Sequence, residues 1–270
     1  MKTILVLLDG LNANTASRTL AYLKTMCQKG FGQSYVLRCE QPSLSRPLYE
    51  CILTGVAPID SGIIHNGISR LSNQKSIFHY AKAAGLTTAA AAYYWVSELY
   101  NRTPFVAVRD RHTDDKQLLI QHGCFYYADH YPDSHLFVDG EYLRTRYQPD
   151  FLFIHSMNID DAGHSHGQDS CEYRRAARDV DGIISNYLFS WLENGYQVII
   201  TSDHGMDNEG NHYADSDEES LVPLFVFGQA FSYKANIAVK QTEICGTLCQ
   251  LLNIPHDKPY CQELLRETQI

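Results

Sequence analysis

No stretch of about 18 or more apolar residues occurs in this sequence, so it predicts no membrane span. The apolar run at residues 4–8 is too short for the core of a signal peptide, and no small-residue cleavage site follows it. The eight cysteines form no CxxC motif, which gives no sign of a thiol-based metal or redox site. These absences together favour a reducing, cytoplasmic location.

Clusters of Lys and Arg are also missing, and the formal net charge is -9. A surface that binds a nucleic-acid scaffold would need such clusters, so that class of partner is disfavoured. An acidic chain can still bind a phosphate where metal ions supply positive charge locally. The length of 270 residues suits a single domain over residues 1–270 with a substantial core.

Short apolar runs alternate with longer amphipathic segments along the chain. This alternation predicts an α/β fold, with a mostly parallel sheet flanked by helices on both faces. The expected strands are residues 4–8, 151–156, 197–201 and 223–227, and the expected helices are residues 15–28, 171–193 and 242–252. Residues 97–146 are rich in Tyr, His and charge, with weak periodicity, and predict a small inserted cap. A peripheral hairpin and helix is the alternative for that segment.

Metal-binding residue types lie where the expected strands end. Ligands gather at the carboxyl ends of strands in such sheets. Taken alone, an Asp after a strand is often a helix N-cap, and a loop His is often a surface residue. Several such residues at three strand ends are harder to explain by packing, and they predict a metal site. These residues are Asp9, Asp160, His164, Asp203, His204 and His212.

A candidate nucleophile lies in the segment 42–49, which reads Pro-Ser-Leu-Ser-Arg-Pro-Leu-Tyr. Pro47 suits the first turn of a helix, and Gly55 suits its end. Ser45 would then lie at the helix N-terminus, where phosphate binds and an alkoxide is favoured. The alternative is that Ser45 only caps the helix.

These segments resemble the alkaline phosphatase superfamily, in particular its type I phosphodiesterase/nucleotide pyrophosphatase branch. That branch carries a Pro-Thr-x-Thr-x-Pro pattern before a short helix ending in Thr-Gly, which corresponds here to residues 42–47 and to Thr54-Gly55. The Ser-Arg-Pro form at Ser45 also resembles the ethanolamine-phosphate transferases of the same superfamily. The branch has an Asn after a Gly-Ile-x-x run, which falls on Asn66. The matching motifs span residues 9–212.

The resemblance implies a phosphoesterase with two divalent ions, zinc by preference and manganese as the rival. It places one ion on Asp9, Ser45, Asp203 and His204, and the other on Asp160, His164 and His212. Ser45 would attack a small-molecule phosphoester and form a phosphoserine intermediate that water then cleaves.

The substrate class depends on the groups beside the nucleophile. Asn66 is a neutral donor, which favours a phosphodiester or pyrophosphate, because monoesters usually need an extra cation. Arg46 is the competing candidate for substrate binding, and a solvent-facing or salt-bridged Arg is its alternative. Trp95 could stack a substrate or pack in the core. We therefore expect a phosphodiesterase, with a monoesterase or phosphotransferase as the main alternative, ahead of a mutase or a non-catalytic metal-binding protein.

Overall fold

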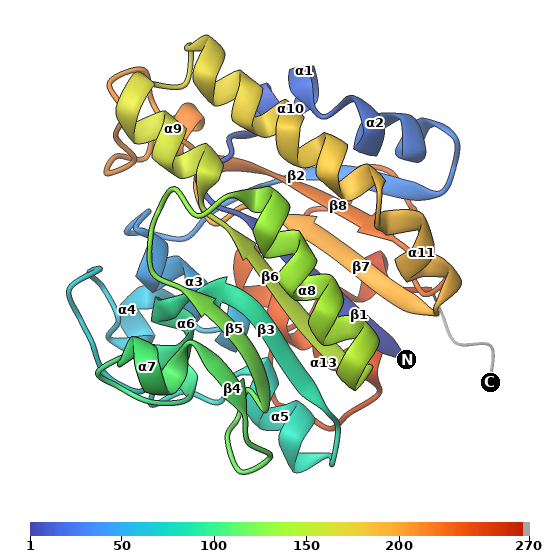
Figure 1. Ribbon diagram of the computed structural model, residues 1–270. Helices are drawn as coiled ribbons and strands as arrows, with labels where there is room; N and C mark the ends of the chain where they lie inside the picture. Colours follow the sequence, from blue (N-terminus) through green and yellow to red (C-terminus); the bar gives the residue numbers. More distant parts are fainter. Residues whose placement is uncertain (267–270) are drawn as a thin grey trace.

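The computed structural model of the chain, which describes residues 1–266, is built on an eight-stranded sheet (Figure 1). The strand order is β2-β8-β7-β1-β6-β3-β5-β4. The five strands from β7 to β5 in this order run parallel, β8 runs opposite to both of its neighbours, and β4 runs opposite to β5. The bounds are β1 Lys2–Leu8, β2 Gly32–Arg38, β3 Thr88–Tyr93, β4 His112–Asp114, β5 His122–Tyr126, β6 Phe151–Ser156, β7 Tyr196–Thr201 and β8 Leu221–Phe227. The expected mostly parallel sheet is confirmed.

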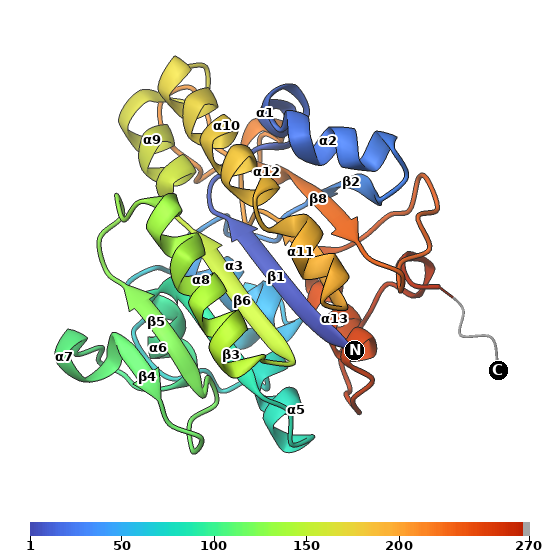
Figure 2. The same cartoon turned by 45° about the vertical axis from the view of Figure 1, so that its right-hand side comes forward.

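Helices cover both faces of the sheet, as Figures 1 and 2 show. On one face lie α3 (Ser45–Thr54), α5 (Ile77–Ala83), α6 (Tyr94–Tyr100) and α13 (Ile244–Leu252). On the other lie α1 (Ala13–Thr19), α2 (Ala21–Gln28), α8 (Asp133–Tyr147), α10 (Cys171–Ser185) and α11 (Leu188–Glu193). Alternate residues of β1 serve the two cores, because successive side chains of a strand point to opposite faces: Leu5 and Leu7 belong to the first core, and Ile4 and Val6 to the second.

The remaining helices are short or lie at the edges of the sheet. They are α4 (Pro58–Ser61), α7 (Ala107–Asp110), α9 (Asn158–His166), α12 (Asp217–Ser220) and the 3₁₀ turns Gln241–Glu243 and Gln262–Leu264. Among residues 1–266, no helix has both the length and the apolar character needed to cross a membrane.

The four expected strands are confirmed as β1, β6, β7 and β8, but the two long expected helices are each divided. Residues 15–28 fall in α1 and α2, which separate at Leu20, and residues 171–193 fall in α10 and α11. The carboxylate of Asp181 accepts hydrogen bonds from the backbone N–H groups of Tyr22 (2.7 Å) and Leu23 (3.1 Å) in the first turn of α2. This cap comes from α10, so the sequence around residue 20 could not reveal it.

Residues 97–146 do not form the expected inserted cap. They supply the end of α6, and then α7, β4, β5 and α8, of which β4 and β5 complete one edge of the sheet. β5 is buried along its whole length, and α8 packs its Leu136 and Phe137 into the second core. The high content of Tyr and His in this segment concealed a short buried strand.

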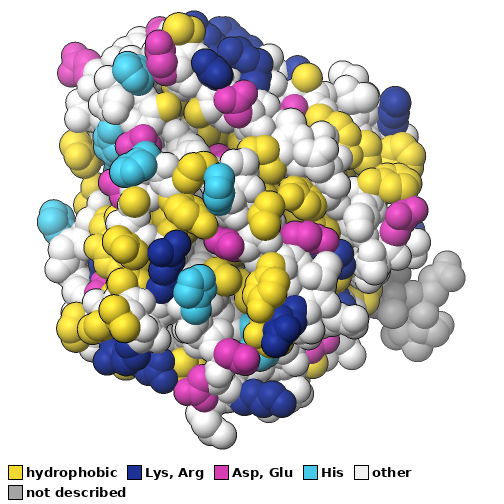
Figure 3. Space-filling model, in the orientation of Figure 1, with side chains coloured by type: hydrophobic (Ala, Val, Ile, Leu, Met, Phe, Trp, Pro, Cys, Tyr) yellow, Lys and Arg dark blue, Asp and Glu magenta, His cyan; other side chains and the backbone are white. Residues whose placement is uncertain are grey.

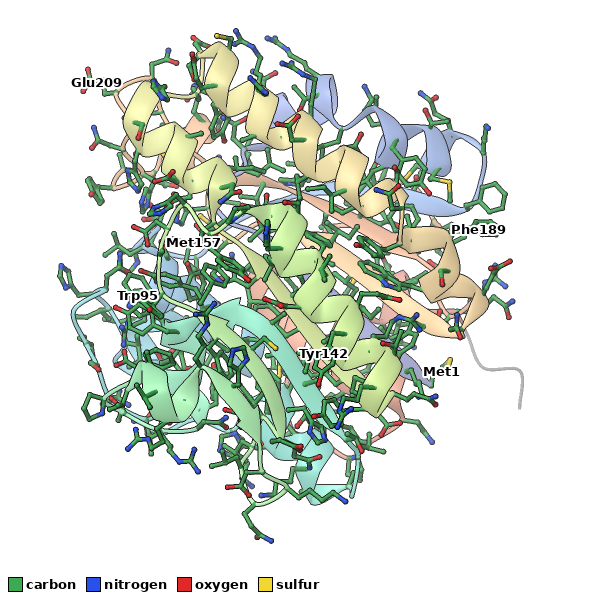
Figure 4. The ribbon with its side chains drawn as sticks, in the orientation of Figure 1. Met1, Trp95, Tyr142, Met157, Phe189 and Glu209 are labelled. Carbon is green, nitrogen blue, oxygen red and sulfur yellow. The ribbon has the colours of Figure 1, made fainter. Side chains whose placement is uncertain are left out.

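The carboxyl ends of β1, β6 and β7 meet at a common edge. Figure 2 shows β1 pointing toward the side of the molecule where α3 and α9 lie. In Figure 4, Trp95 and Met157 lie toward this side, whereas Phe189 and Met1 lie at the opposite one. On the face drawn in Figure 3, His and acidic side chains gather at the upper left, near α9. The sheet therefore brings the predicted site residues to one end of the molecule.

Candidate metal centre and active site

The six predicted metal-binding side chains converge although they come from separate segments. Asp9, Asp203 and His204 place ligand atoms within 4.8 Å of one another, and so do Asp160, His204 and His212. His204 thus belongs to both groups, and its ring stacks on that of His212 at 3.7 Å. His164 contacts this cluster through Asp160, because Nε2 of His164 lies 3.4 Å from Oδ2 of Asp160. All of these side chains except that of His164 are buried.

Each of the three carboxylates leaves one oxygen without a partner. Oδ1 of Asp9, Oδ1 of Asp160 and Oδ2 of Asp203 are buried and accept no hydrogen bond from any of the described residues. An unpaired buried carboxylate oxygen is costly, and metal coordination is a standard way to satisfy it. The three oxygens fit cations bound between them.

The three imidazoles are oriented in the same way. Nδ1 of His164 lies 2.8 Å from the carbonyl oxygen of Gly210, and Nδ1 of His204 lies 2.9 Å from that of Gly205. Nδ1 of His212 lies 2.6 Å from the carbonyl oxygen of Ser43. Each Nδ1–H therefore donates to the backbone, which leaves the Nε2 lone pair for a metal. Such backbone partners fix the ring and tautomer of metal-binding histidines in proteins.

The electrostatics of the site also call for cations. Burial, together with the neighbouring carboxylates, raises the pKa of Asp9 well above its usual value. Burial raises the pKa of Asp160 to about 7 and that of Asp203 to about 6. Burial lowers the pKa of His204 and of His212 to about 3, so both rings are neutral. Neutral imidazoles with crowded carboxylates form a donor set that suits zinc or manganese.

Ser45 is the first residue of α3, and its hydroxyl faces the metal ligands. Oγ of Ser45 lies 3.1 Å from Nε2 of His204. The N-cap position belongs to Leu44, so the hydroxyl does not serve as the helix cap. The helix ends at Gly55 as expected, with a left-handed φ of 69° that favours glycine. Ser43, the other serine of the motif, instead donates to the carbonyl oxygen of His212 at 2.6 Å.

Asn66 is bound to the backbone of the nucleophile helix. Its Oδ1 accepts a hydrogen bond of 3.0 Å from the backbone N–H of Arg46. This contact fixes the amide with Nδ2 turned away from that backbone. No acceptor for Nδ2 is found among the described residues, so this donor is free to bind a ligand.

The guanidinium of Arg46 is buried and turned toward α6. Its Nη2 lies 2.9 Å from Oε2 of Glu98, and its Nη1 donates to the carbonyl oxygen of Ile68 at 3.2 Å. Trp95 is half-buried, and its ring centre lies 4.6 Å from the guanidinium carbon. The salt-bridged alternative considered for Arg46 therefore describes its position, and Trp95 packs against it.

Two residues that contact Asp9 were not identified as site residues from the sequence. Oδ2 of Asp9 accepts a hydrogen bond from the hydroxyl of Tyr49 and lies 3.0 Å from Nε2 of His155. Nδ1 of His155 accepts from the backbone N–H of Tyr93 at 3.4 Å, so its proton is on Nε2. Both contacts orient Asp9 so that its Oδ1 faces the centre. Tyr49 lies one helical turn after Ser45, and this spacing could have indicated it.

The sheet and the site together define an α/β protein with an alkaline phosphatase-like fold and a candidate metal centre at the carboxyl ends of its strands. The chain belongs to the type I phosphodiesterase/nucleotide pyrophosphatase family, whose family model matches residues 3–224. The predicted superfamily is therefore confirmed.

Relatives and solved structures extend this result. The chain is 24% identical to human GPI ethanolamine phosphate transferase 2, catalytic subunit, over 98% of its own length and 27% of that protein. It thus spans about a quarter of that relative's length. Its fold is similar to that of murine ectonucleotide pyrophosphatase/phosphodiesterase 5, with a TM-score of 0.77, 16% identity, and coverage of 98% of this chain and 100% of the other. An inactive form of the murine protein in complex with AMP gives a TM-score of 0.73 at 16% identity, over 98% and 100% of the two chains.

Proposed function

We propose that this chain is a two-metal phosphoesterase that hydrolyses a phosphodiester or pyrophosphate bond through a phosphoserine at Ser45. One observation carries the proposal. Three buried carboxylate oxygens that accept no hydrogen bond from the described residues, and three imidazole Nε2 atoms freed by backbone contacts, gather in one site, where the hydroxyl of Ser45 lies 3.1 Å from Nε2 of His204. No packing role accounts for that combination.

The metal ions would be held as the family resemblance implies. Asp9, Asp203 and His204 would hold one ion beside Ser45, and Asp160, His164 and His212 would hold the other. When bound, two divalent ions would lower the pKa of the serine hydroxyl and offset the charge of the phosphoryl oxygens. Zinc is the proposed ion and manganese the alternative, because both accept this mixture of imidazole and carboxylate ligands.

The reaction would proceed in two displacements at phosphorus. Oγ of Ser45 forms a bond to phosphorus while the bond to the leaving oxygen breaks, and the proton from the serine balances the leaving alkoxide. Water then attacks the phosphoserine, the Oγ–P bond breaks, and Ser45 regains a proton. The helix N-terminus behind Ser45 adds a favourable dipole for the anionic phosphoryl group.

Asn66 would stabilise charge on the phosphoryl oxygens during both steps. Its Nδ2 is free to donate, because Oδ1 is bound to the N–H of Arg46. A neutral donor in that position suits a substrate whose phosphoryl group carries one negative charge. The AMP bound to the murine structural neighbour supports a small-molecule substrate such as a nucleotide derivative.

A phosphotransferase is the second candidate function. The relative that aligns with 98% of this chain is an ethanolamine phosphate transferase, and the Ser-Arg-Pro motif at Ser45 resembles that group. In this function an alcohol would replace water in the second displacement, with no change in the first. We propose a reducing compartment, the cytoplasm, for either function, because all eight cysteines are free thiols, and two of them, Cys27 and Cys171, are half-buried and exposed.

The test is turnover of an aryl phosphodiester and an aryl phosphomonoester with the same leaving group, with metal analysis of the same sample. We expect about two bound divalent ions per chain and faster turnover of the diester. An added alcohol such as ethanolamine separates the two candidates, because a transferase would form the new phosphoester in preference to free product. An active sample without metal would contradict the proposal.

A further inference from the structure

The residue next to the nucleophile carries a positive charge that does not face the nucleophile. Arg46 follows Ser45 directly at the start of α3, and its backbone N–H holds the amide of Asn66. A guanidinium this close to a phosphoryl group would favour a dianion, because charge-assisted bidentate contacts to phosphate are strong. The direction of this side chain therefore bears on which phosphoesters the site accepts.

Glu98 fixes that direction from across the interface between α3 and α6. Its Oε2 lies 2.9 Å from Nη2 of Arg46, and the side chains of Glu98 and Arg46 are 7% and 3% exposed. The ring of Trp95, which Figure 4 labels, lies against the guanidinium. A buried charge needs a charged or hydrogen-bonded partner, so Glu98 and Arg46 depend on each other for burial.

The ionic attachment of Arg46 depends on one carboxylate oxygen, and its other side-chain contacts are the carbonyl oxygen of Ile68 and the ring of Trp95. The other oxygen of Glu98, Oε1, accepts the backbone N–H of Phe105 at 2.9 Å, so the pair is not bidentate. Nε of Arg46 is buried without an acceptor among the residues the structure describes. Within that same part of the chain, Glu98 is the only acidic residue within ion-pair distance of Arg46. A change at Glu98 would therefore leave the guanidinium without an ionic partner, held only by one hydrogen bond to the carbonyl oxygen of Ile68 and by the ring of Trp95 among the described residues.

We propose that Glu98 is a specificity-determining residue that selects phosphodiesters over phosphomonoesters by holding Arg46 away from the phosphoryl site. With Arg46 held, the neutral amide of Asn66 faces the substrate, which suits a phosphoryl group with one negative charge. Freed from Glu98, the guanidinium could turn toward the phosphoryl oxygens and offset the second charge of a monoester. This inference rests on the proposed phosphoesterase function and names the residue that sets its substrate class.

The test is Glu98→Gln in the full chain, assayed with a matched aryl diester and aryl monoester. The Gln side chain has nearly the same shape, and its one oxygen can still accept the N–H of Phe105, which leaves its NH₂ group facing Arg46 without attraction. We expect the ratio of monoester to diester kcat/KM to rise by at least about tenfold, as one new charge-assisted contact would produce. An unchanged ratio in a variant with a normal melting profile would overturn the proposal.

The matched control replaces both partners with apolar groups, as Arg46→Met/Glu98→Leu. Replacement of a buried ion pair by apolar residues of similar volume is often tolerated. This variant has no guanidinium to release, so its ratio should stay within about threefold of the unchanged protein. If Glu98→Gln fails to fold, the double variant provides the test of the proposal. A drop in its diester kcat/KM of about 100-fold or more, in a folded sample, would mean that Arg46 contacts the substrate. The proposal would then be wrong.

The same assays distinguish failure of the proposed phosphoesterase function from failure of the proposed role of Glu98. If the unchanged protein turns over neither ester when loaded with zinc or manganese, the phosphoesterase proposal is at fault. If it turns over the diester and the ratio does not respond to Glu98→Gln, only the role of Glu98 is at fault. If the unchanged protein prefers the monoester, the role of Glu98 is likewise excluded.

Discussion

The charged groups on the two sides of helix α3 differ in whether they have hydrogen-bond or ion-pair partners. On one side the hydroxyl of Ser45 lies 3.1 Å from Nε2 of His204, in the site where Asp9, Asp160 and Asp203 each keep a buried oxygen without a partner among the described residues. On the other side Glu50 accepts hydrogen bonds from the hydroxyls of Ser72 and Tyr100. The Arg46–Glu98 pair lies on that second side as well.

The difference separates groups that await a ligand from groups that hold the fold. A buried polar group without a partner destabilises the protein unless something binds to it, whereas a paired one ties segments together. The side of α3 that carries Arg46 and Glu50, the paired side, links α3 to α6 and to the segment that carries Asn66. It thereby positions the side that carries Ser45, the unpaired side. The predictions below test this division, beginning with the largest effect.

Metal removal should have the largest effect, because Asp9, Asp160 and Asp203 form no ion pair with a Lys or Arg among the described residues. We expect a chelator to reduce turnover to background, and zinc or manganese to restore it. The metal-free protein should also melt at a lower temperature, since ions that bind only the folded state stabilise it. Metal analysis and a melting curve on the same samples check both results. Full activity after complete metal loss would remove the distinction between the two sides.

Ser45→Ala should lower turnover by at least about 10³-fold, because it removes the proposed nucleophile. Stability should change little, since the hydroxyl does not cap α3. The control is Ser43→Ala, whose hydroxyl contacts the backbone of the segment carrying His212 and not the centre. A severe loss in Ser43→Ala together with a mild one in Ser45→Ala would reverse the roles assigned to these two residues.

Asn66→Ala should lower diester turnover by about 10²–10³-fold, the cost of removing one donor to a developing phosphoryl charge. The matched control is Asn73→Ala, an exposed asparagine in the same segment that should leave turnover nearly unchanged. Steady-state kinetics on an aryl diester measure both variants. Equal turnover of the two variants would mean that Nδ2 of Asn66 does not reach the substrate.

Glu50→Ala tests the paired side, and its effect should be on stability. The substitution leaves the hydroxyl of Tyr100 without its acceptor, removes one of the two acceptors of the Ser72 hydroxyl and opens a cavity, so we expect a loss of about 3–5 kcal/mol in the free energy of unfolding. The metal content of the folded protein should not change. Denaturant unfolding followed by metal analysis measures both quantities. Loss of metal without loss of stability would place Glu50 with the unpaired side.

The smallest expected effect is the contribution of Asp133 to the pH dependence of stability. Burial raises the pKa of this carboxyl to about 7, and its Oδ1 accepts a hydrogen bond from Ser156 at 2.6 Å. The folded protein therefore binds a proton that the unfolded chain has released above about pH 4. Stability should fall as pH rises from about 4 to about 7 and level off above that, by about 1–3 kcal/mol for this group.

Asp133→Asn should remove this contribution, because an amide mimics the protonated acid at every pH. Unfolding in denaturant at pH 5 and at pH 8 measures the difference between the variant and the unchanged protein. Compared with the unchanged protein, the variant should be more stable at pH 8 than it is at pH 5. Parallel pH dependence in the two proteins would show that the carboxyl of Asp133 does not carry the titration.

The sequence predicted the residues of the candidate site more fully than it predicted their contacts. The buried strands that precede Asp9 and Asp203 were visible as apolar runs followed by acidic residues, because local burial patterns and strand ends are short-range features. The helix from Ser45 to Gly55 was bounded by its own residues. From the alternation of strands and helices, the carboxyl ends of a parallel sheet could be expected to bring these residues together.

Only the tertiary structure decided what each charged group faces. The partner of Arg46 is 52 residues away in the chain, and the contacts of Asp9 with Tyr49 and His155 span 40 and 146 residues. The cap on α2 comes from Asp181, β5 is fixed by its pairing with β3, and β4 is fixed by its pairing with β5. Residue type and local pattern carry no record of such distant partners, because burial and ion pairing depend on which segments the fold packs together.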